Sequence, residues 1–174
     1  YELVTRLIRN LRGLRFSFST VPRDYIISIV GPYFTWSHFT GLPLLSVVLI
    51  KHIIKFNLES KVKLVNSSMD IQASLILGDI IVMPSITPEP FGRIILEAQA
   101  LGKIPIAFDH GGASETIING KNGFLAEPLN IKSLAENISS AVSLKKTKRE
   151  KMEDYSKKFV SKNFSHDKMC KLTL

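Results

Sequence analysis

Two glutamates, Glu89 and Glu97, stand eight positions apart in the stretch EPFGRIILE, on either side of a short turn. A carboxylate accepts hydrogen bonds from hydroxyl groups, and it can accept two from a vicinal diol such as that of a ribose. Glu97 falls within a helical, mostly apolar pattern, where an unpaired carboxylate would be costly. The sequence leaves two interpretations of Glu97 open: a ligand for a diol, or an i,i+4 partner of Arg93. Glu89 precedes the turn and either contacts a ligand or faces solvent.

The residues after Glu89 are suited to holding phosphate. Pro90 stiffens the backbone, and Gly92 opens a predicted helix and lets a ligand come close to the main chain. The first N–H groups of that helix lack intrahelical partners and lie at the positive end of its dipole, so they form a natural anion seat. The run His110-Gly111-Gly112 predicts a second cradle of N–H groups beside it.

These residues must be positioned by elements whose hydrophobic patterns alternate along the chain. Continuous apolar runs indicate strands, and apolar positions spaced by three and four residues indicate helices. The predicted strands cover residues 24–30, 61–65, 79–84, 104–109 and 123–126. The predicted helices cover residues 1–12, 43–56, 69–78, 93–101, 113–118 and 131–144.

Strands that are apolar on both faces and alternate with helices favour a parallel sheet that is covered on both sides. We therefore predict the α/β class and a Rossmann-like doubly wound parallel sheet. In such an open sheet, ligands bind outside the carboxyl ends of the strands. The turns expected there begin at Gly31, Asn66, Ser85 and Asp109, and the last two contain the residues described above.

Length and composition bound the domain organisation and the partners. The chain has 174 residues, 45% of them hydrophobic, and predicts a single domain with a core over 1–144 and a basic helical tail over 145–174. A formal net charge of +8 suits a polyphosphate ligand, an anionic membrane surface or nucleic acid. The lack of an aromatic and basic RNA-binding signature argues against nucleic acid. The single cysteine, Cys170, permits no internal disulfide and fits a reducing compartment.

The motif series around the two glutamates resembles a known family. Glu89-Pro90-Phe91-Gly92-Arg93 followed by Glu97-Ala98 is similar to the E-x7-E motif of the retaining, GT-B type glycosyltransferases called family 4, or group 1. The segments DIIVMPS at 79–85, GKIPIAFDHGGASETI at 102–118 and NGKNGFLAEP at 119–128 resemble those that surround this motif in the family. The resemblance implies the C-terminal, donor-binding half of a GT-B enzyme.

The resemblance also implies a role for each matching position. Glu89 would contact hydroxyls of the donor sugar near the reacting centre and is the catalytic candidate, whereas Glu97 would bind the ribose hydroxyls of a nucleotide. The nucleotide base would lie near Val65 and Asn66. The donor sugar and its diphosphate would be bound by Gly31, Pro90, Phe91, Gly92, Arg93, His110, Gly111 and Gly112.

The same resemblance implies a reaction and a location. A hexosyl group would pass with retention from a nucleotide-diphosphate sugar to a glycan or lipid-linked acceptor, in the synthesis of cell-envelope polysaccharide. The resemblance implies that helix N-termini and basic side chains stabilise the leaving diphosphate, so we expect neither a metal nor another cofactor. The sequence agrees with this expectation, because it has no D-x-D and no His/Cys cluster. We expect a cytoplasmic protein, with peripheral contact to anionic lipid at the inner face of the membrane as a further option.

The chain departs from the family pattern at three points. The family's Arg and Lys-Gly would fall before Tyr1, its N-terminal acceptor domain is absent, and Asn66 stands where a glycine is common. We therefore expect the isolated chain to be incomplete for catalysis. The alternative is a truncated or degenerate nucleotide-binding module without turnover. A dinucleotide-dependent oxidoreductase is disfavoured, because no G-x-G-x-x-G follows the first predicted strand.

Overall fold

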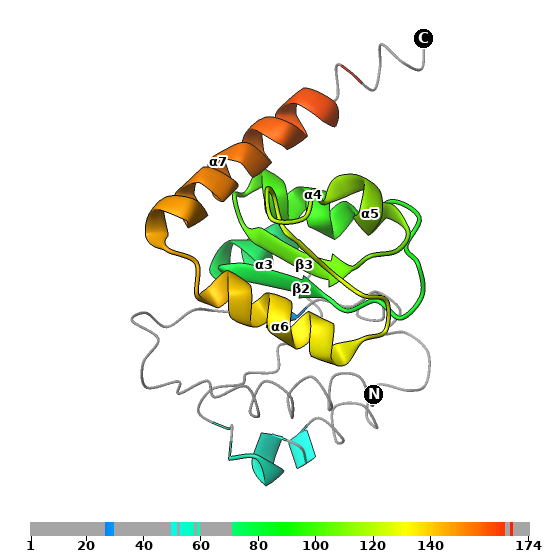
Figure 1. Cartoon of the computed structure of the whole chain (residues 1–174), viewed down its shortest axis with the longest axis vertical. Helices are drawn as coiled ribbons and strands as arrows, with labels where there is room; N and C mark the ends of the chain where they lie inside the picture. Colours follow the sequence, from blue (N-terminus) through cyan, green and yellow to red (C-terminus); the bar gives the residue numbers. More distant parts are fainter. Residues whose placement is uncertain are drawn as a thin grey trace.

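A computed structural model gives the fold and describes residues 27–29, 50, 51, 53–57, 59, 71–165 and 168 (Figure 1). The predicted helix over 1–12 and the predicted strand over 61–65 lie outside the described residues, as do Gly31, Val65 and Asn66. Within the predicted helix over 43–56, residues 50, 51 and 53–55 are helical.

The other described elements follow the predicted alternation of strands and helices. The strands are β1 (Ile27–Ile29), β2 (Ile80–Met83), β3 (Ile104–Phe108) and β4 (Phe124–Ala126). The helices are α3 (Ile71–Leu77), α4 (Arg93–Ala100), α5 (Gly112–Thr116), α6 (Ile131–Val142) and α7 (Lys146–Asn163).

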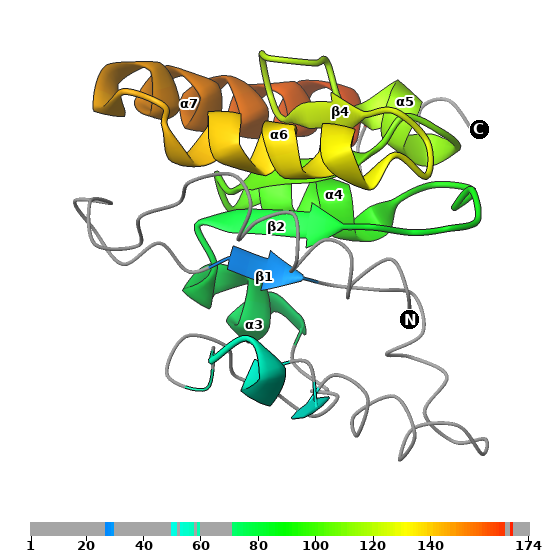
Figure 2. The same ribbon diagram turned by 60° about the horizontal axis from the view of Figure 1, so that its bottom comes forward.

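The four described strands form one parallel sheet in the order β1-β2-β3-β4 (Figure 2). Ile80 of β2 is level with Ile27 of β1 and with Ile104 of β3, and Ile106 of β3 is level with Phe124 of β4. Because neighbouring parallel strands point the same way, the loops that follow β2 and β3 begin side by side.

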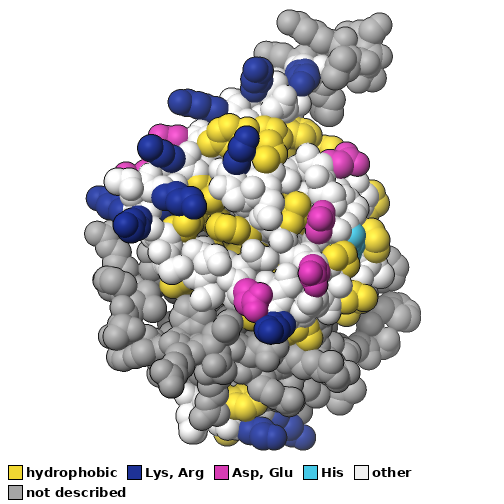
Figure 3. Space-filling view, in the orientation of Figure 1, with side chains coloured by type: hydrophobic (Ala, Val, Ile, Leu, Met, Phe, Trp, Pro, Cys, Tyr) yellow, Lys and Arg dark blue, Asp and Glu magenta, His cyan; other side chains and the backbone are white. Residues whose placement is uncertain are grey.

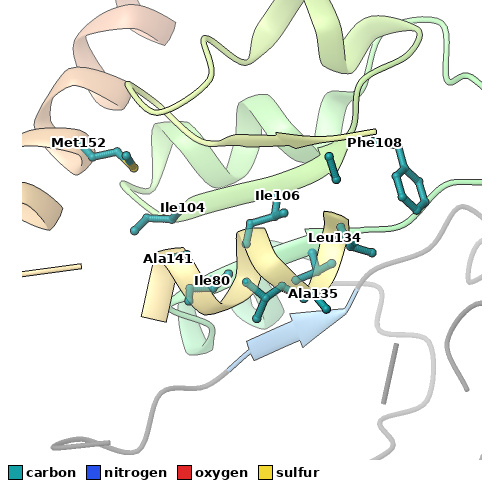
Figure 4. Packing of buried hydrophobic residues seen from close by; sticks show 11 residues of the cluster. Ile80, Ile104, Ile106, Phe108, Leu134, Ala135, Ala141 and Met152 are labelled. Atoms are coloured by element: carbon teal, nitrogen blue, oxygen red, sulfur yellow. The ribbon is translucent and has the colours of Figure 1, made fainter. Parts of the chain in front are cut away.

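Helices cover both faces of the sheet, as the continuous apolar strands predict. Alternate residues of β2 and β3, such as Val82 and Ile106, pack with Leu134 and Ile138 of α6 (Figure 4). The residues between them along each strand point to the other face and pack in two clusters. One cluster joins the strand residues Met83 and Ala107 with Ile95, Ala113 and Ile117. The other joins Ile81 with Leu75 and Ala98. The described residues therefore have the predicted α/β, Rossmann-like architecture.

The last helix, α7, packs against α4 and is fixed to the body of the domain by polar contacts. The guanidinium of Arg149 donates to Asp79 Oδ1 and to Glu153 Oε1, each at 2.7 Å. Further along α7, the buried Ser156 hydroxyl donates to the carbonyl of Met152 at 2.8 Å and approaches that of Asn122 at 3.4 Å. Charged and polar contacts thus hold this otherwise basic helix in place.

One helix differs from its predicted range. We expect a helix over 113–118, whereas α5 ends at Thr116 because Ile117 adopts an extended backbone with φ −105° and ψ 123°. The Asn122 side chain accepts a hydrogen bond from the Ile118 N–H at 2.6 Å, which gives that amide a partner outside a helix. Asn122 is fully buried and stabilises the turn in this way.

In the described part of the chain, none of the helices combines the length and the apolarity that crossing a membrane requires.

Candidate functional site

Two loops meet at the carboxyl edge of the sheet, one after β2 and one after β3. The first runs over residues 84–92 and the second over 109–111. The Gly112 N–H donates to the Glu89 carbonyl at 2.7 Å, and the His110 imidazole, through Nε2, lies 3.0 Å from the Ser85 carbonyl. Since a carbonyl can only accept, Nε2 carries the hydrogen in this contact. These two bonds join the loops into one unit.

The two glycines of the second loop are required by close packing. A Cβ added to Gly112 would lie 2.5 Å from the Phe91 carbonyl carbon, and one added to Gly111 would lie 2.5 Å from the Glu89 carbonyl oxygen. Gly111 also has φ +58°, in the left-handed region that disfavours side chains. The backbone of residues 88–91 therefore rests directly on Gly111 and Gly112.

Two of the three N–H groups in the cradle predicted at His110-Gly111-Gly112 have partners in the fold, and the role of these residues toward a ligand stays a prediction. The N–H of Gly112 is used by the Glu89 carbonyl, and the N–H of His110 donates to the Phe108 carbonyl at 2.9 Å. Neither group is free to bind an anion. The imidazole of His110 braces the two loops, and its buried Nδ1 has no hydrogen-bond partner among the described residues.

Glu89 is held at the point where the loops meet. The buried Ser85 hydroxyl donates to Glu89 Oε1 at 2.8 Å, while the Glu89 backbone is fixed by Gly112. The residue is partly exposed, and Oε2 has no hydrogen-bond partner in the part of the chain that the structure describes. One carboxylate oxygen is thus anchored and the other remains able to accept from a ligand hydroxyl.

The N-terminus of α4 follows this carboxylate directly. Gly92, the N-cap, has φ +66° and ψ +45° and makes no side-chain capping bond. The Ile95 N–H donates to the Gly92 carbonyl at 2.9 Å, but the N–H groups of Arg93 and Ile94 have no preceding helical carbonyl. The first turn of α4 therefore retains the predicted capacity to bind an anion.

Glu97 lies one turn further along α4, with its side chain 29% exposed. Arg93 Nη2 donates to Glu97 Oε1 at 3.4 Å, and the Arg93 side chain is 82% exposed. The i,i+4 pair expected from the sequence is therefore present, but such an exposed and long contact contributes little to stability. It occupies one oxygen of Glu97, so the pairing leaves the carboxylate available to a diol as well.

Phe91 at the tip of the first loop extends the site toward the end of α7. The residue is 54% exposed, and its ring makes an edge contact with Phe164, with ring centroids 6.2 Å apart. Phe164 in turn contacts Phe159, and Phe159 stacks on Tyr155. We call these four residues the aromatic cluster. It ties the loop to α7, a connection that the sequence does not predict. Pro90, beside Phe91, is exposed.

Ser85 is not among the site residues that the sequence predicts. The signal for it is weak but real: a serine directly after an apolar strand, four positions before Glu89, within reach of that carboxylate. Among the described residues, no group of three or more His, Cys, Asp or Glu side chains is arranged to hold a metal ion.

A parallel sheet covered on both faces, with two interlocked loops at its carboxyl edge, defines a Rossmann-like domain, a class in which ligands bind at that edge. Comparison with known proteins identifies the family within this class. The chain belongs to the family of glycosyl transferases group 1, whose family model matches residues 27–159. A curated relative is the lipopolysaccharide 1,2-N-acetylglucosaminetransferase of Salmonella typhimurium, which is 30% identical over 95 residues, covering 54% of this chain and 24% of the relative.

Solved structures show the same fold. Anabaena Alr3699/HepE, solved in complex with UDP and glucose, superposes with a TM-score of 0.74 at 22% identity, over 95% of this chain and 52% of that one. The C-terminal domain of the group 1 family glycosyl transferase LpcC from Francisella tularensis gives 0.66 at 20% identity, over 91% and 92%. The fold is that of the C-terminal domain of a GT-B glycosyltransferase, and the chain spans about half of the Anabaena protein.

Proposed function

We propose that the chain is the donor-binding half of an enzyme that moves a hexosyl group from a nucleotide-diphosphate sugar to a glycan or lipid-linked acceptor, with retention. The observation that carries the proposal is the fixed order of groups at the carboxyl edge of the sheet. A carboxylate with one free oxygen, a helix N-terminus and a second, partly exposed carboxylate follow one another over Glu89, Gly92 and Glu97.

These groups follow one another in the same order as the sugar, the diphosphate and the ribose of a nucleotide sugar. In the proposed arrangement, Glu89 Oε2 accepts from a hydroxyl of the donor sugar near the reacting carbon, and Glu97 accepts from the ribose hydroxyls. The diphosphate lies at the first turn of α4, against Phe91, Gly92 and Arg93, with Pro90 preceding them. There the helix N-terminus and the Arg93 cation stabilise the negative charge that develops on the leaving diphosphate. No metal or other cofactor is part of the proposal.

The second loop supports this arrangement. Gly111 and Gly112 allow the backbone of residues 88–91 to come close, and His110 braces Ser85. Through these contacts, in the proposed arrangement, the second loop holds the first loop in place where the donor sugar and the diphosphate bind. The proposed roles of Gly31 at the diphosphate and of Val65 and Asn66 at the base concern residues outside those that the structure describes.

The relatives support both the donor and the type of product. The Anabaena structure holds UDP and glucose, and the Salmonella relative is named for the transfer of N-acetylglucosamine to lipopolysaccharide. A further curated relative, from Staphylococcus aureus, is named as a glycosyltransferase of capsular polysaccharide biosynthesis. We therefore propose that the enzyme acts in cell-envelope polysaccharide synthesis in the cytoplasm.

The charge distribution supports contact with an anionic membrane surface. Lys and Arg side chains gather over α7, as Figure 3 shows, and the chain has a net charge of +8. We propose that this helix attracts the enzyme to the inner face of the membrane, where a lipid-linked acceptor would lie.

Calorimetric titration of the chain with UDP, GDP, ADP and their sugar conjugates tests the donor assignment. We expect one nucleotide to bind and Glu97→Gln to weaken its binding about tenfold or more, since a hydrogen bond to a charged group contributes about 1.5–3 kcal/mol. Glu136→Gln is the matched control, because Glu136 pairs with Lys132 at i,i+4 on α6, away from the site. A folded chain that binds no nucleotide, or equal effects of the two variants, would refute the proposal.

Catalysis should need more than this chain. Donor and acceptor must be held together for transfer to be fast, and the acceptor-binding domain expected from the resemblance is not among the 174 residues. Efficient sugar transfer by residues 1–174 alone would contradict this part of the proposal.

A further inference from the structure

Ser85 stands out among the buried polar residues because its hydroxyl faces the candidate site. The residue is only 4% exposed, and a buried hydroxyl needs a partner. Its partner is Glu89 Oε1, at 2.8 Å. The Ser85 carbonyl accepts from His110 Nε2 at 3.0 Å, so the main chain of Ser85 is itself tied to the second loop.

The contacts around Glu89 leave its side chain little freedom. The Glu89 carbonyl accepts from the Gly112 N–H at 2.7 Å, which fixes the backbone. The Ser85 hydroxyl holds the far end of the Glu89 side chain through one of its carboxylate oxygens. A glutamate side chain that is held in this way can adopt fewer rotamers. Its conformational entropy is therefore lost on folding and not when a ligand binds.

We propose that Ser85 is a positioning residue, which holds Glu89 so that its free Oε2 faces the hydroxyls of the donor sugar. This inference rests on the proposed function and deepens it, because it assigns the recognition of the sugar, as distinct from the nucleotide, to a pair of residues. Ser85 acts only through Glu89, whereas the diphosphate and the ribose are bound by α4 and Glu97. Loss of the Ser85 hydroxyl should therefore weaken the binding of the sugar conjugate and spare the free nucleotide diphosphate.

The test compares two ligands and a double-mutant cycle. Calorimetry would measure the affinity of wild type, Ser85→Ala, Glu89→Ala and the double variant for the nucleotide diphosphate that wild type binds and for its sugar conjugate. We expect Ser85→Ala to weaken the conjugate about tenfold, the loss typical of one hydrogen bond to a charged group. We expect the diphosphate affinity to change less than about twofold, within the neutral range for a residue that makes no contact with it. In the Glu89→Ala background, which removes the acceptor of the Ser85 hydroxyl, Ser85→Ala should add nothing further.

Other results would overturn the inference. Equal losses for the two ligands would mean that Ser85 only supports the loop, and additive losses in the cycle would mean that it acts independently of Glu89. If Ser85→Ala does not fold, as judged by circular dichroism, Ser85→Thr retains the hydroxyl. Selectivity for the conjugate over the diphosphate should then stay at the wild-type value, and its loss would refute the positioning role. Failure of wild type to bind any nucleotide would instead refute the proposed function itself.

Discussion

Replacing Gly112 by alanine should separate the two interlocked loops. The new Cβ would lie 2.5 Å from the Phe91 carbonyl carbon and 2.7 Å from its Cα and its oxygen, whereas ordinary contacts begin at 3.4 Å. The loops must therefore move apart by roughly 1 Å, a distance that matters for the placement of reacting groups. All three obstructing atoms belong to the backbone, so no side-chain rotation can relieve the clash.

The energetic cost of Gly112→Ala follows from two terms. Overpacking of this kind costs about 1–3 kcal/mol, and the bond from the Gly112 N–H to the Glu89 carbonyl, worth about 1 kcal/mol, would stretch. Alanine is ordinarily favoured over glycine in a helix by roughly 0.5–1 kcal/mol. We therefore expect a net decrease of about 2 kcal/mol in the free energy of unfolding. Helix propensity alone would predict the opposite, an increase in stability.

Urea denaturation and nucleotide titration would measure this prediction. Gly120→Ala is the control, because Gly120 has φ +76° but nothing within 4 Å of its added Cβ. The control should lose about 1 kcal/mol from the left-handed backbone alone and keep wild-type affinity for the nucleotide sugar. We expect Gly112→Ala to bind the nucleotide sugar about tenfold more weakly, as the loss of one charged hydrogen bond would. Wild-type stability and affinity in Gly112→Ala would refute the reasoning.

Two further predictions concern α7. Arg149→Met should lower the free energy of unfolding, measured by urea denaturation, by about 2 kcal/mol, because it removes the partly buried bond to Asp79. The control Lys146→Met removes an exposed pair at 3.8 Å and should cost less than about 0.5 kcal/mol. Equal losses in the two variants would contradict this prediction. Phe164→Ala should speed amide hydrogen exchange over residues 89–95, because the loop loses the contact of Phe91 with Phe164. Tyr155→Ala, which removes only the contact with Phe159, should leave this exchange unchanged. Unchanged exchange in Phe164→Ala would refute the prediction.

The sequence predicts the sheet well because the signals for it are local. The runs IIVM and IPIAF of β2 and β3 are apolar without interruption, and they are buried on both faces. The motif also places Glu89, Gly92 and Glu97 correctly around a helix start, since that arrangement depends on a few consecutive residues.

The sequence predicts less well where distant segments meet. From sequence, Gly111 and Gly112 suggest free N–H groups, but in the fold these glycines lie against the backbone of Glu89 and Phe91, and the Glu89 carbonyl uses the N–H of Gly112. The contact of Phe91 with Phe164 joins residues far apart in the chain, and neither has a local pattern that indicates the other. Such contacts follow from how α4 and α7 pack, which spacing along one segment does not encode.

The attachment of α7 at both ends has a consequence for synthesis. Arg149 near its start bonds to Asp79, and Phe164 just after its end lies against Phe91, so the helix bridges residues on either side of β2. Because a chain leaves the ribosome from its N-terminus, the sheet and both loops emerge before this helix does. The contact of Phe91 with Phe164 can form only when residue 164 has cleared the exit tunnel, so the first loop reaches its final packing later than the sheet that carries it.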